Sequence, residues 1–306
     1  MHPAYSVIFF TSASGGGYGL LVWLGLLGAS GQLPSDRWFG FVGLAWALLM
    51  VVAGLLASTA HLGHPERAWR AFSQWRSSWL SREGVMAVLT FVPAGILAVF
   101  WVFLGRILPV VALLTAISAL LTIACTAMIY ASLKTIRRWR HPLTVPAYVA
   151  IGLSTGALWL ACLGFGHVAW LAAITLAIAG MVKFAYWHSI DHEKPGETTA
   201  SATGLGAPGK VHLFAAPHTS ENYLQREMGF QIARKHALKL RRIALLLGFG
   251  APLLLCLLAA LLPAVPAFLA LLLAVIFNAA GVLTERWLFF AEARHTVMLY
   301  YGAEAA

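Results

Sequence analysis

Eight long apolar segments decide what class of fold this chain adopts. A helix needs about 20 apolar residues to cross a hydrocarbon core that is about 30 Å thick. The segments that meet this length are residues 5–29, 38–60, 84–104, 110–133, 146–165, 169–187, 243–262 and 266–284. The sequence therefore predicts an all-α, polytopic membrane protein with eight transmembrane helices, folded as a single domain over residues 1–306.

The composition agrees with a membrane location. Apolar residues make up 60% of the chain and charged residues only 10%, whereas charged residues make up about 25% of a typical soluble domain. A soluble globular protein is therefore excluded. The formal net charge of +10 sits in the connections between helices, where it suits anionic lipid headgroups rather than nucleic acid.

The charged connections also predict an orientation. Of the 21 Lys and Arg residues, only Arg37 and Arg106 lie on one side of the predicted bundle, and all the others lie on the opposite side. Cytoplasmic connections are enriched in Lys and Arg, so both termini are expected in the cytoplasm. A basic face that docks an acidic partner would show the same bias. The long connection 188–242 leaves the membrane on this face, and we expect it to dock a soluble subunit.

Glycine recurs at helix-contact spacing in two of the predicted helices. Gly15, Gly16, Gly17 and Gly19 cluster in the first helix, and Gly152 and Gly156 stand four residues apart in the fifth. Small residues at such spacing let membrane helices approach closely. We expect these glycines to pack helices together rather than to contact a ligand.

The segment between the second and third helices combines aromatic and basic residues. Trp69, Phe72, Trp75 and Trp79 recur at near-helical spacing, with arginines between them. This pattern is typical of an amphipathic segment that lies in the membrane interface. A wall for a lipid-soluble substrate is the alternative.

Two proton-handling residues flank that segment. His61 stands where the second helix leaves the hydrocarbon, and Glu83 stands where the third helix begins. A quinone needs such groups, because its carbonyl oxygens gain or lose protons as electrons move. The alternative is structural: His61 would be an interfacial hydrogen-bonding residue, and Glu83 would stabilise the positive end of a helix. Near the end of the last helix, Arg286 is the deepest cation and a candidate to contact a quinone oxygen.

The sequence predicts no redox centre within this chain. Its three cysteines, Cys125, Cys162 and Cys256, lie in separate predicted helices without CxxC spacing. The histidines stand near helix ends or in connections, so no pair is expected to ligate a haem inside the membrane. If the protein passes electrons, its own residues are therefore expected to hold no redox centre.

One run of residues resembles a known family. The sequence His61-Leu62-Gly63-x-Pro65-x-Arg67-Ala68, followed by Glu83, is similar to that of the membrane anchor subunits of the dimethyl sulfoxide reductase type. A weaker likeness is Arg286 followed by His295-Thr296-Val297. The resemblance extends over essentially the whole chain in helix number and length.

The resemblance implies an eight-helix anchor that binds menaquinone or ubiquinone and holds no haem. It implies two partners: a four-cluster iron–sulfur subunit and a catalytic subunit with the molybdenum cofactor. In the family, the positions of His61 and Glu83 are implicated in quinol chemistry. Arg67 and Arg286 carry over by position.

The basic face distinguishes this chain from the family's usual pattern. His61 and Glu83 lie on the face that is predicted to be cytoplasmic, and the segment 75–83 and the connection 188–242 look more like the anchor of cytoplasmic sulfite dehydrogenases. We therefore expect a quinone-binding anchor that serves sulfite oxidation, with both soluble subunits on the cytoplasmic face. The alternatives are a dimethyl sulfoxide reductase anchor that oxidises menaquinol, and a purely structural membrane tether.

The charge asymmetry leads to a topology prediction. A reporter protein fused after Ala306 should be active in its cytoplasmic form and inactive as periplasmic alkaline phosphatase, because the positive face stays in the cytoplasm. Alkaline phosphatase activity at this position would reverse the orientation.

Overall fold

The computed structural model describes residues 3–60, 62–164, 168–193, 196–206, 211–215, 217–220, 222–228 and 236–305. Within these ranges, eight helical spans are long and apolar enough to cross a membrane, which confirms the predicted fold class. The spans are α1 (Tyr5–Ala29), α2 (Arg37–Thr59), α3 (Trp79–Ala98) with η2 (Val99–Phe103), α4 (Pro109–Ala131), α5 (Thr144–Cys162), α6 (Ala169–His192), α10 (Ala237–Leu245) with η4 (Leu246–Gly250) and α11 (Ala251–Ala259), and α12 (Ala264–Ala291).

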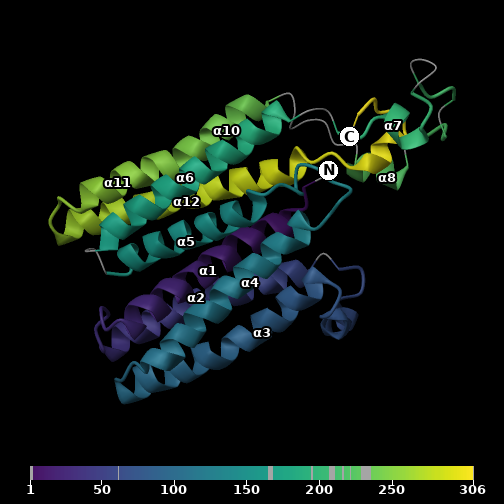
Figure 1. Cartoon of the computed structure of the whole chain (residues 1–306). Coiled ribbons are helices and arrows are strands. Elements are labelled where there is room, and N and C mark those ends of the chain that lie inside the picture. Colours follow the sequence, from purple (N-terminus) through teal and green to yellow (C-terminus); the bar gives the residue numbers. More distant parts are fainter. Residues whose placement is uncertain are drawn as a thin grey trace.

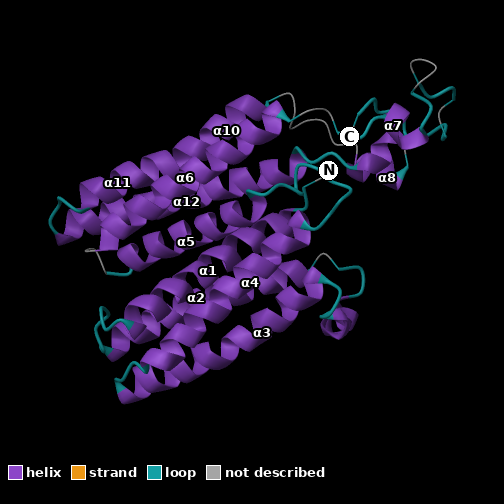
Figure 2. Cartoon of the chain, in the orientation of Figure 1, coloured by secondary structure: helices purple, strands orange, loops and turns teal. Residues whose placement is uncertain are grey.

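The spans form two groups that lie side by side. Helices α1 to α4 make one group, and α5, α6, α10, α11 and α12 make the other (Figure 1). Both termini and the short helices α7 (Thr199–Thr203) and α8 (Tyr223–Met228) lie at one end of the bundle. This is the end with the basic connections. Among the described residues, the opposite end has only short turns, and no strand occurs in the part of the chain that is coloured in Figure 2.

Glycines join the two groups where α1 meets α5. A Cβ atom added at Gly19 would overlap the carbonyl group of Gly152, and one added at Gly156 would overlap the backbone of Gly19. The two backbones are therefore in direct contact, as membrane helices with small residues allow. The structure confirms the predicted packing role of Gly19, Gly152 and Gly156.

Several helices extend further than the hydrophobicity pattern predicts. α3 begins at Trp79, with the Ser78 side chain accepting a hydrogen bond from the Ser81 amide as its N-cap, whereas the pattern placed its start at residue 84. α12 continues to Ala291 instead of residue 284. The prediction was wrong here because charged residues were taken to end a span, although a buried charge with partners continues a helix. Glu83 and Arg286 consequently lie inside helices.

The aromatic and basic segment forms the 3₁₀ helix η1 (Pro65–Gln74). Trp69 and Trp75 are 66% and 53% exposed. Arg82 holds the segment against α3, because its guanidinium donates to the Trp75 carbonyl at 3.0 Å and to the Arg76 carbonyl at 2.7 Å. The segment is thus fixed to the basic end with its indoles outward, and its location in the membrane interface stays a prediction.

The π-helical turn η4 (Leu246–Gly250) is connected by hydrogen bonds to two other helices of the second group. η4 interrupts the span from α10 to α11, and its Gly248 carbonyl accepts a hydrogen bond from Asn278 Nδ2 at 2.7 Å. Thr155 Oγ1 of α5 donates to Asn278 Oδ1 at 3.0 Å. Single π turns often mark functional positions, and here the turn ties α5, α12 and η4 together through one amide side chain.

The α1–α5 contact leads to a stability prediction. Gly156→Leu should separate the two helix groups and lower the thermal midpoint in detergent, because overpacking costs about 1–3 kcal/mol or more. Gly95→Leu is the matched control, since an added Cβ at Gly95 in α3 has no atom within 4 Å. Equal midpoints for the two variants, measured by size-exclusion chromatography after heating, would contradict the role of this contact.

Candidate functional site

Glu83 is a buried carboxyl group within a membrane-spanning helix. It lies in the second turn of α3 and is 5% exposed. Thr126 Oγ1 of α4 donates a hydrogen bond to Glu83 Oε1 at 2.5 Å. Ionisable side chains inside a membrane are costly, so they mark functional sites unless a structural partner explains them. A single threonine hydroxyl does not neutralise a carboxylate.

Thr126 also borders a polar cavity between the two helix groups. α1, α4, α5 and α12 enclose this cavity, and its volume of about 10 Å³ has room for about one water molecule. Its polar lining consists of Thr11, Ser12, Ser14, Tyr18, Thr126, Tyr148, Thr155 and Arg286. Thr126 thus connects the cavity wall to Glu83, which does not itself line the cavity.

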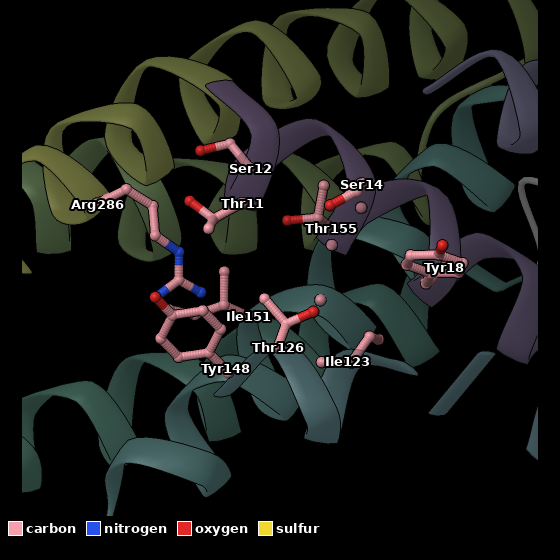
Figure 3. A pocket seen from close by; sticks show the side chains of 13 residues that line it. Thr11, Ser12, Ser14, Tyr18, Ile123, Thr126, Tyr148, Ile151, Thr155 and Arg286 are labelled. Atoms are coloured by element: carbon pink, nitrogen blue, oxygen red, sulfur yellow. The ribbon is translucent and has the colours of Figure 1, made fainter. Parts of the chain in front are cut away.

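Arg286 supplies the positive charge of the cavity. Figure 3 shows its side chain directed from α12 toward Tyr148 of α5, with Tyr18 at the other end of the cavity. The guanidinium carbon lies 3.7 Å from the centre of the Tyr148 ring, and the residue is 2% exposed. Nε has no hydrogen-bond partner among the described residues. A buried donor of this kind is expensive to leave unpaired, so the cavity suits a water molecule or an acceptor oxygen.

A buried ion pair lies behind Arg286. Lys183 Nζ of α6 is 2.5 Å from Glu285 Oε1 of α12, and both residues are at most 1% exposed. Glu285 Oε2 is also 3.4 Å from Arg286 Nη1. The two cations and Glu285 together carry one net positive charge, which an ionised Glu83 balances. The charges of the two helix groups are therefore complementary across the cavity.

The sequence alone did not predict this ion pair. The charge pattern assigned Lys183 to the basic face, but the structure places the side chain inside the bundle, over the rings of Tyr186 and Trp187 at 4.1 and 4.7 Å. The available signal was a single lysine within the otherwise apolar segment 169–187, which by itself suggests a buried functional or paired charge.

A second charge network closes the basic end of the bundle. Arg241 donates from Nε and Nη2 to the two carboxylate oxygens of Glu292 at 2.9 Å, and from Nη1 to Asp191 at 2.5 Å. Arg138 Nη1 lies 3.8 Å from Glu292. These contacts join α6, α10 and the end of α12. Arg241 is thus a structural cation of the bundle, although its sequence position suggested a loop charge.

His141 reinforces this end without adding charge. Its Nε2 lies 2.9 Å from Ser189 Oγ, and the Leu143 amide donates to its Nδ1 at 3.1 Å. Burial lowers the pKa of His141, and the nearby Glu193 opposes this shift only in part. The imidazole therefore stays neutral at neutral pH and ties the α4–α5 connection to α6.

No metal site was found in the parts of the chain that the structure describes. No group of three or more His, Cys, Asp or Glu side chains lies there in an arrangement that could hold an ion. The chemistry of the described site consists of proton donors, proton acceptors and fixed charge.

Comparison with known proteins identifies the family. The model of the family "DMSO reductase anchor subunit (DmsC)" matches residues 1–302. The chain belongs to this family. It is also 36% identical to one of the sulfite dehydrogenase subunits of Allochromatium vinosum, over an alignment of 334 residues that covers 100% of both chains. The predicted resemblance is thereby confirmed, and the protein is a membrane anchor subunit of the dimethyl sulfoxide reductase type.

The four residues predicted for the site of this anchor differ in their location in the structure. Glu83 and Arg286 are both buried, and Tyr130 of α4 lies within electrostatic range of each. Arg67 is on the exposed helix η1, where it pairs with Glu66 at 3.7 Å, and it has no contact with the cavity. His61 lies outside the described residues. The structure thus brings together two of the four candidates.

The buried ion pair of the anchor leads to a ranking of variants. Glu285→Gln should lower the thermal midpoint of the purified protein more than Lys183→Met, because it leaves two buried cations without their carboxylate. Breaking a buried pair typically costs about 3–5 kcal/mol. In Lys183→Met the remaining Glu285 still faces Arg286. Glu66→Gln on η1 is the exposed control. A larger loss for Lys183→Met would contradict this charge balance.

Proposed function

We propose that this chain is the quinone-reactive anchor of a three-subunit molybdenum oxidoreductase in a bacterial inner membrane. It passes electrons from an iron–sulfur subunit to the quinone pool, while the molybdenum subunit oxidises sulfite on the cytoplasmic face. The observation that carries this proposal is the buried carboxyl group of Glu83, which Thr126 joins to a cavity where Arg286 presents an unpaired donor.

The arrangement suits the proton chemistry of a quinone. Reduction of one quinone to quinol takes two electrons and two protons, and the protons must reach oxygen atoms that lie within the hydrocarbon. Glu83 is close to the basic end of α3, so it can take a proton from that side and pass it by way of the Thr126 hydroxyl and one water molecule. Arg286 stabilises negative charge as it develops on an oxygen atom.

His61 keeps its proposed role beside Glu83. The described part of α2 ends at Thr59, at the same basic end of the bundle where α3 begins. A histidine two residues further along is suited to exchange protons with the aqueous phase near neutral pH. We therefore retain His61 as the outer proton group and Glu83 as the inner one.

The basic end also carries a platform for soluble partners. The segment that follows α6 is joined to the C-terminal tail by a bridge between Thr198 and Ala305 and by a 2.9 Å hydrogen bond from Asn222 Nδ2 to the Tyr301 hydroxyl. α7 and α8 lie beyond the helix ends on this side (Figure 1). This platform supports the proposal that connection 188–242 docks the iron–sulfur subunit.

Sulfite is the preferred substrate of the complex because a full-length relative is a sulfite dehydrogenase subunit, and because the basic end suits the cytoplasm. The second candidate is a dimethyl sulfoxide reductase anchor that oxidises menaquinol, which the family description favours. The same residues would then release protons instead of taking them up. A purely structural tether would not explain why the carboxyl group of Glu83 is buried within the membrane.

The role of Glu83 leads to a kinetic prediction. In membranes that contain the whole complex, sulfite should reduce quinone, and Glu83→Gln should lower this turnover by about 10²–10⁴-fold, the usual loss when an acid–base group is removed. His61→Ala should have an effect of the same kind. Both variants should still copurify with their soluble subunits. Glu66→Gln, on the exposed helix η1, should leave turnover unchanged.

Two outcomes would contradict two different parts of the proposal, the role of Glu83 and the choice of substrate. Normal quinone turnover in an assembled Glu83→Gln complex would leave Glu83 with a structural role only. A purified complex that reduces dimethyl sulfoxide with menaquinol, and shows no sulfite-dependent quinone reduction, would select the second candidate.

A further inference from the structure

An apolar groove lies on the outer seam between the two helix groups. α1 and α2 form one side, and α5 and α12 form the other. Its volume is about 470 Å³, which is within the range of small-molecule sites, about 300–1,000 Å³. The main apolar side chains that line it are Phe9, Trp46, Leu49, Met50, Trp159 and Leu283. Leu49 and Phe9 are 57% and 46% exposed, so the groove opens toward the lipid.

The groove and the polar cavity share a wall. Ser12 of α1 and Thr155 of α5 line both. Figure 3 shows these two side chains among the residues that line the cavity, together with Thr126 and Arg286. A molecule in the groove would therefore be separated from the proton-handling residues only by Ser12 and Thr155.

The polar cavity and the groove differ in volume, and therefore in what each can hold. The polar cavity, at about 10 Å³, admits about one water molecule and has no room for a quinone ring. The groove has more than enough room for a substituted ring and the first part of its tail. Of these two spaces only the groove can hold the ring, and the cavity is left to protons and water.

We propose that this groove binds the isoprenoid quinone, with the ring against Ser12 and Thr155 and the tail directed past Leu49 and Leu283 into the bilayer. This inference rests on the proposed function and locates its substrate. Two electrons come from the reduced iron–sulfur partner, and two protons come from the basic end by way of Glu83 and the cavity. The product is quinol, and no group of this chain is oxidised or reduced.

Trp46 favours a quinone over a lipid chain as the occupant. Its indole lines the groove 4.8 Å from the Trp159 ring, and its N–H has no hydrogen-bond acceptor in the described part of the protein. An unpaired donor in hydrocarbon costs free energy. A quinone carbonyl in the groove could accept from this buried N–H after a shift of the indole, whereas a lipid acyl chain offers no acceptor.

Asn278, another polar side chain of the groove, has a structural role. Asn278 uses its oxygen to accept from Thr155 and its amide to donate to Gly248. With both groups satisfied, Asn278 holds the floor of the groove rigid. Among the described residues, Trp46 thus has an unpaired donor on the groove side of the shared wall, and Tyr18, Tyr148 and Arg286 have unpaired donors on the cavity side.

Neighbouring alanines on α12 provide a matched test. Ala279 lines the groove and Ala280 does not, and both are exposed. In the assembled complex, Ala279→Trp should fill the groove and raise the KM for a long-tailed isoprenoid quinone by about tenfold, or about 1.4 kcal/mol. A tail-less quinone should be affected much less. Ala280→Trp should leave both KM values unchanged.

A binding readout complements the kinetics. An azido-quinone with an isoprenoid tail should photolabel residues of α1, α2, α5 or α12 around the groove in the wild-type complex. The label should be lost in Ala279→Trp and kept in Ala280→Trp. Trp46→Phe keeps an aromatic ring but removes the donor, so it should raise the KM several-fold for quinones of either tail length.

The possible outcomes distinguish a failure of the groove proposal from a failure of the proposed function. A wild-type complex without any quinone reaction would overturn the proposed function. If the wild-type complex reacts with quinone, but Ala279→Trp behaves like Ala280→Trp and the label maps to other helices, then the groove holds lipid and this inference is wrong.

Discussion

The backbone contact between α1 and α5 is the constraint on which the rest of the structure depends. Because Gly19, Gly152 and Gly156 have no side chains, the two helix groups meet without a layer of large residues between them. The polar residues of α1 thereby face α5 and α12 directly. The cavity, its shared wall with the groove and the approach of Arg286 to Thr126 all follow from this one contact. Bulky residues at the seam would fill this space and separate the carboxyl group from the guanidinium.

Charge balance explains why such polar groups are tolerated in a membrane protein. Each group contributes charges that the other compensates: Glu83 in the first, and Lys183, Glu285 and Arg286 in the second. Burial of an unpaired charge would be prohibitive, so the ion pair and the cavity form one electrostatic unit. The network at the basic end balances the two cations Arg138 and Arg241 against the two carboxylates Glu292 and Asp191, and it holds helix ends together.

Hydrophobic periodicity predicted the number of spans, and small-residue spacing predicted that glycines of the first and fifth helices pack against other helices, because both patterns lie within single segments. Which helices meet was not predicted. The positions of Glu83 and Arg286 near helix ends made both candidates, and the family likeness supported them and added Arg67. The positions of helix ends were less predictable, since Lys183, Glu285 and Arg286 look like boundaries until their partners on other helices are known. The cavity and the groove were not predictable at all, because each is lined by residues from four helices whose arrangement no single segment encodes.

The shallow position of Glu83 in α3 has a bioenergetic consequence. Under the proposed mechanism, both the electrons and the protons for the quinone reach it from one side of the bilayer, and sulfite oxidation releases its protons on that same side. Each turnover then moves no net charge across the membrane. An enzyme built on this anchor would supply quinol to other respiratory complexes without generating membrane potential itself, so its rate would be insensitive to that potential.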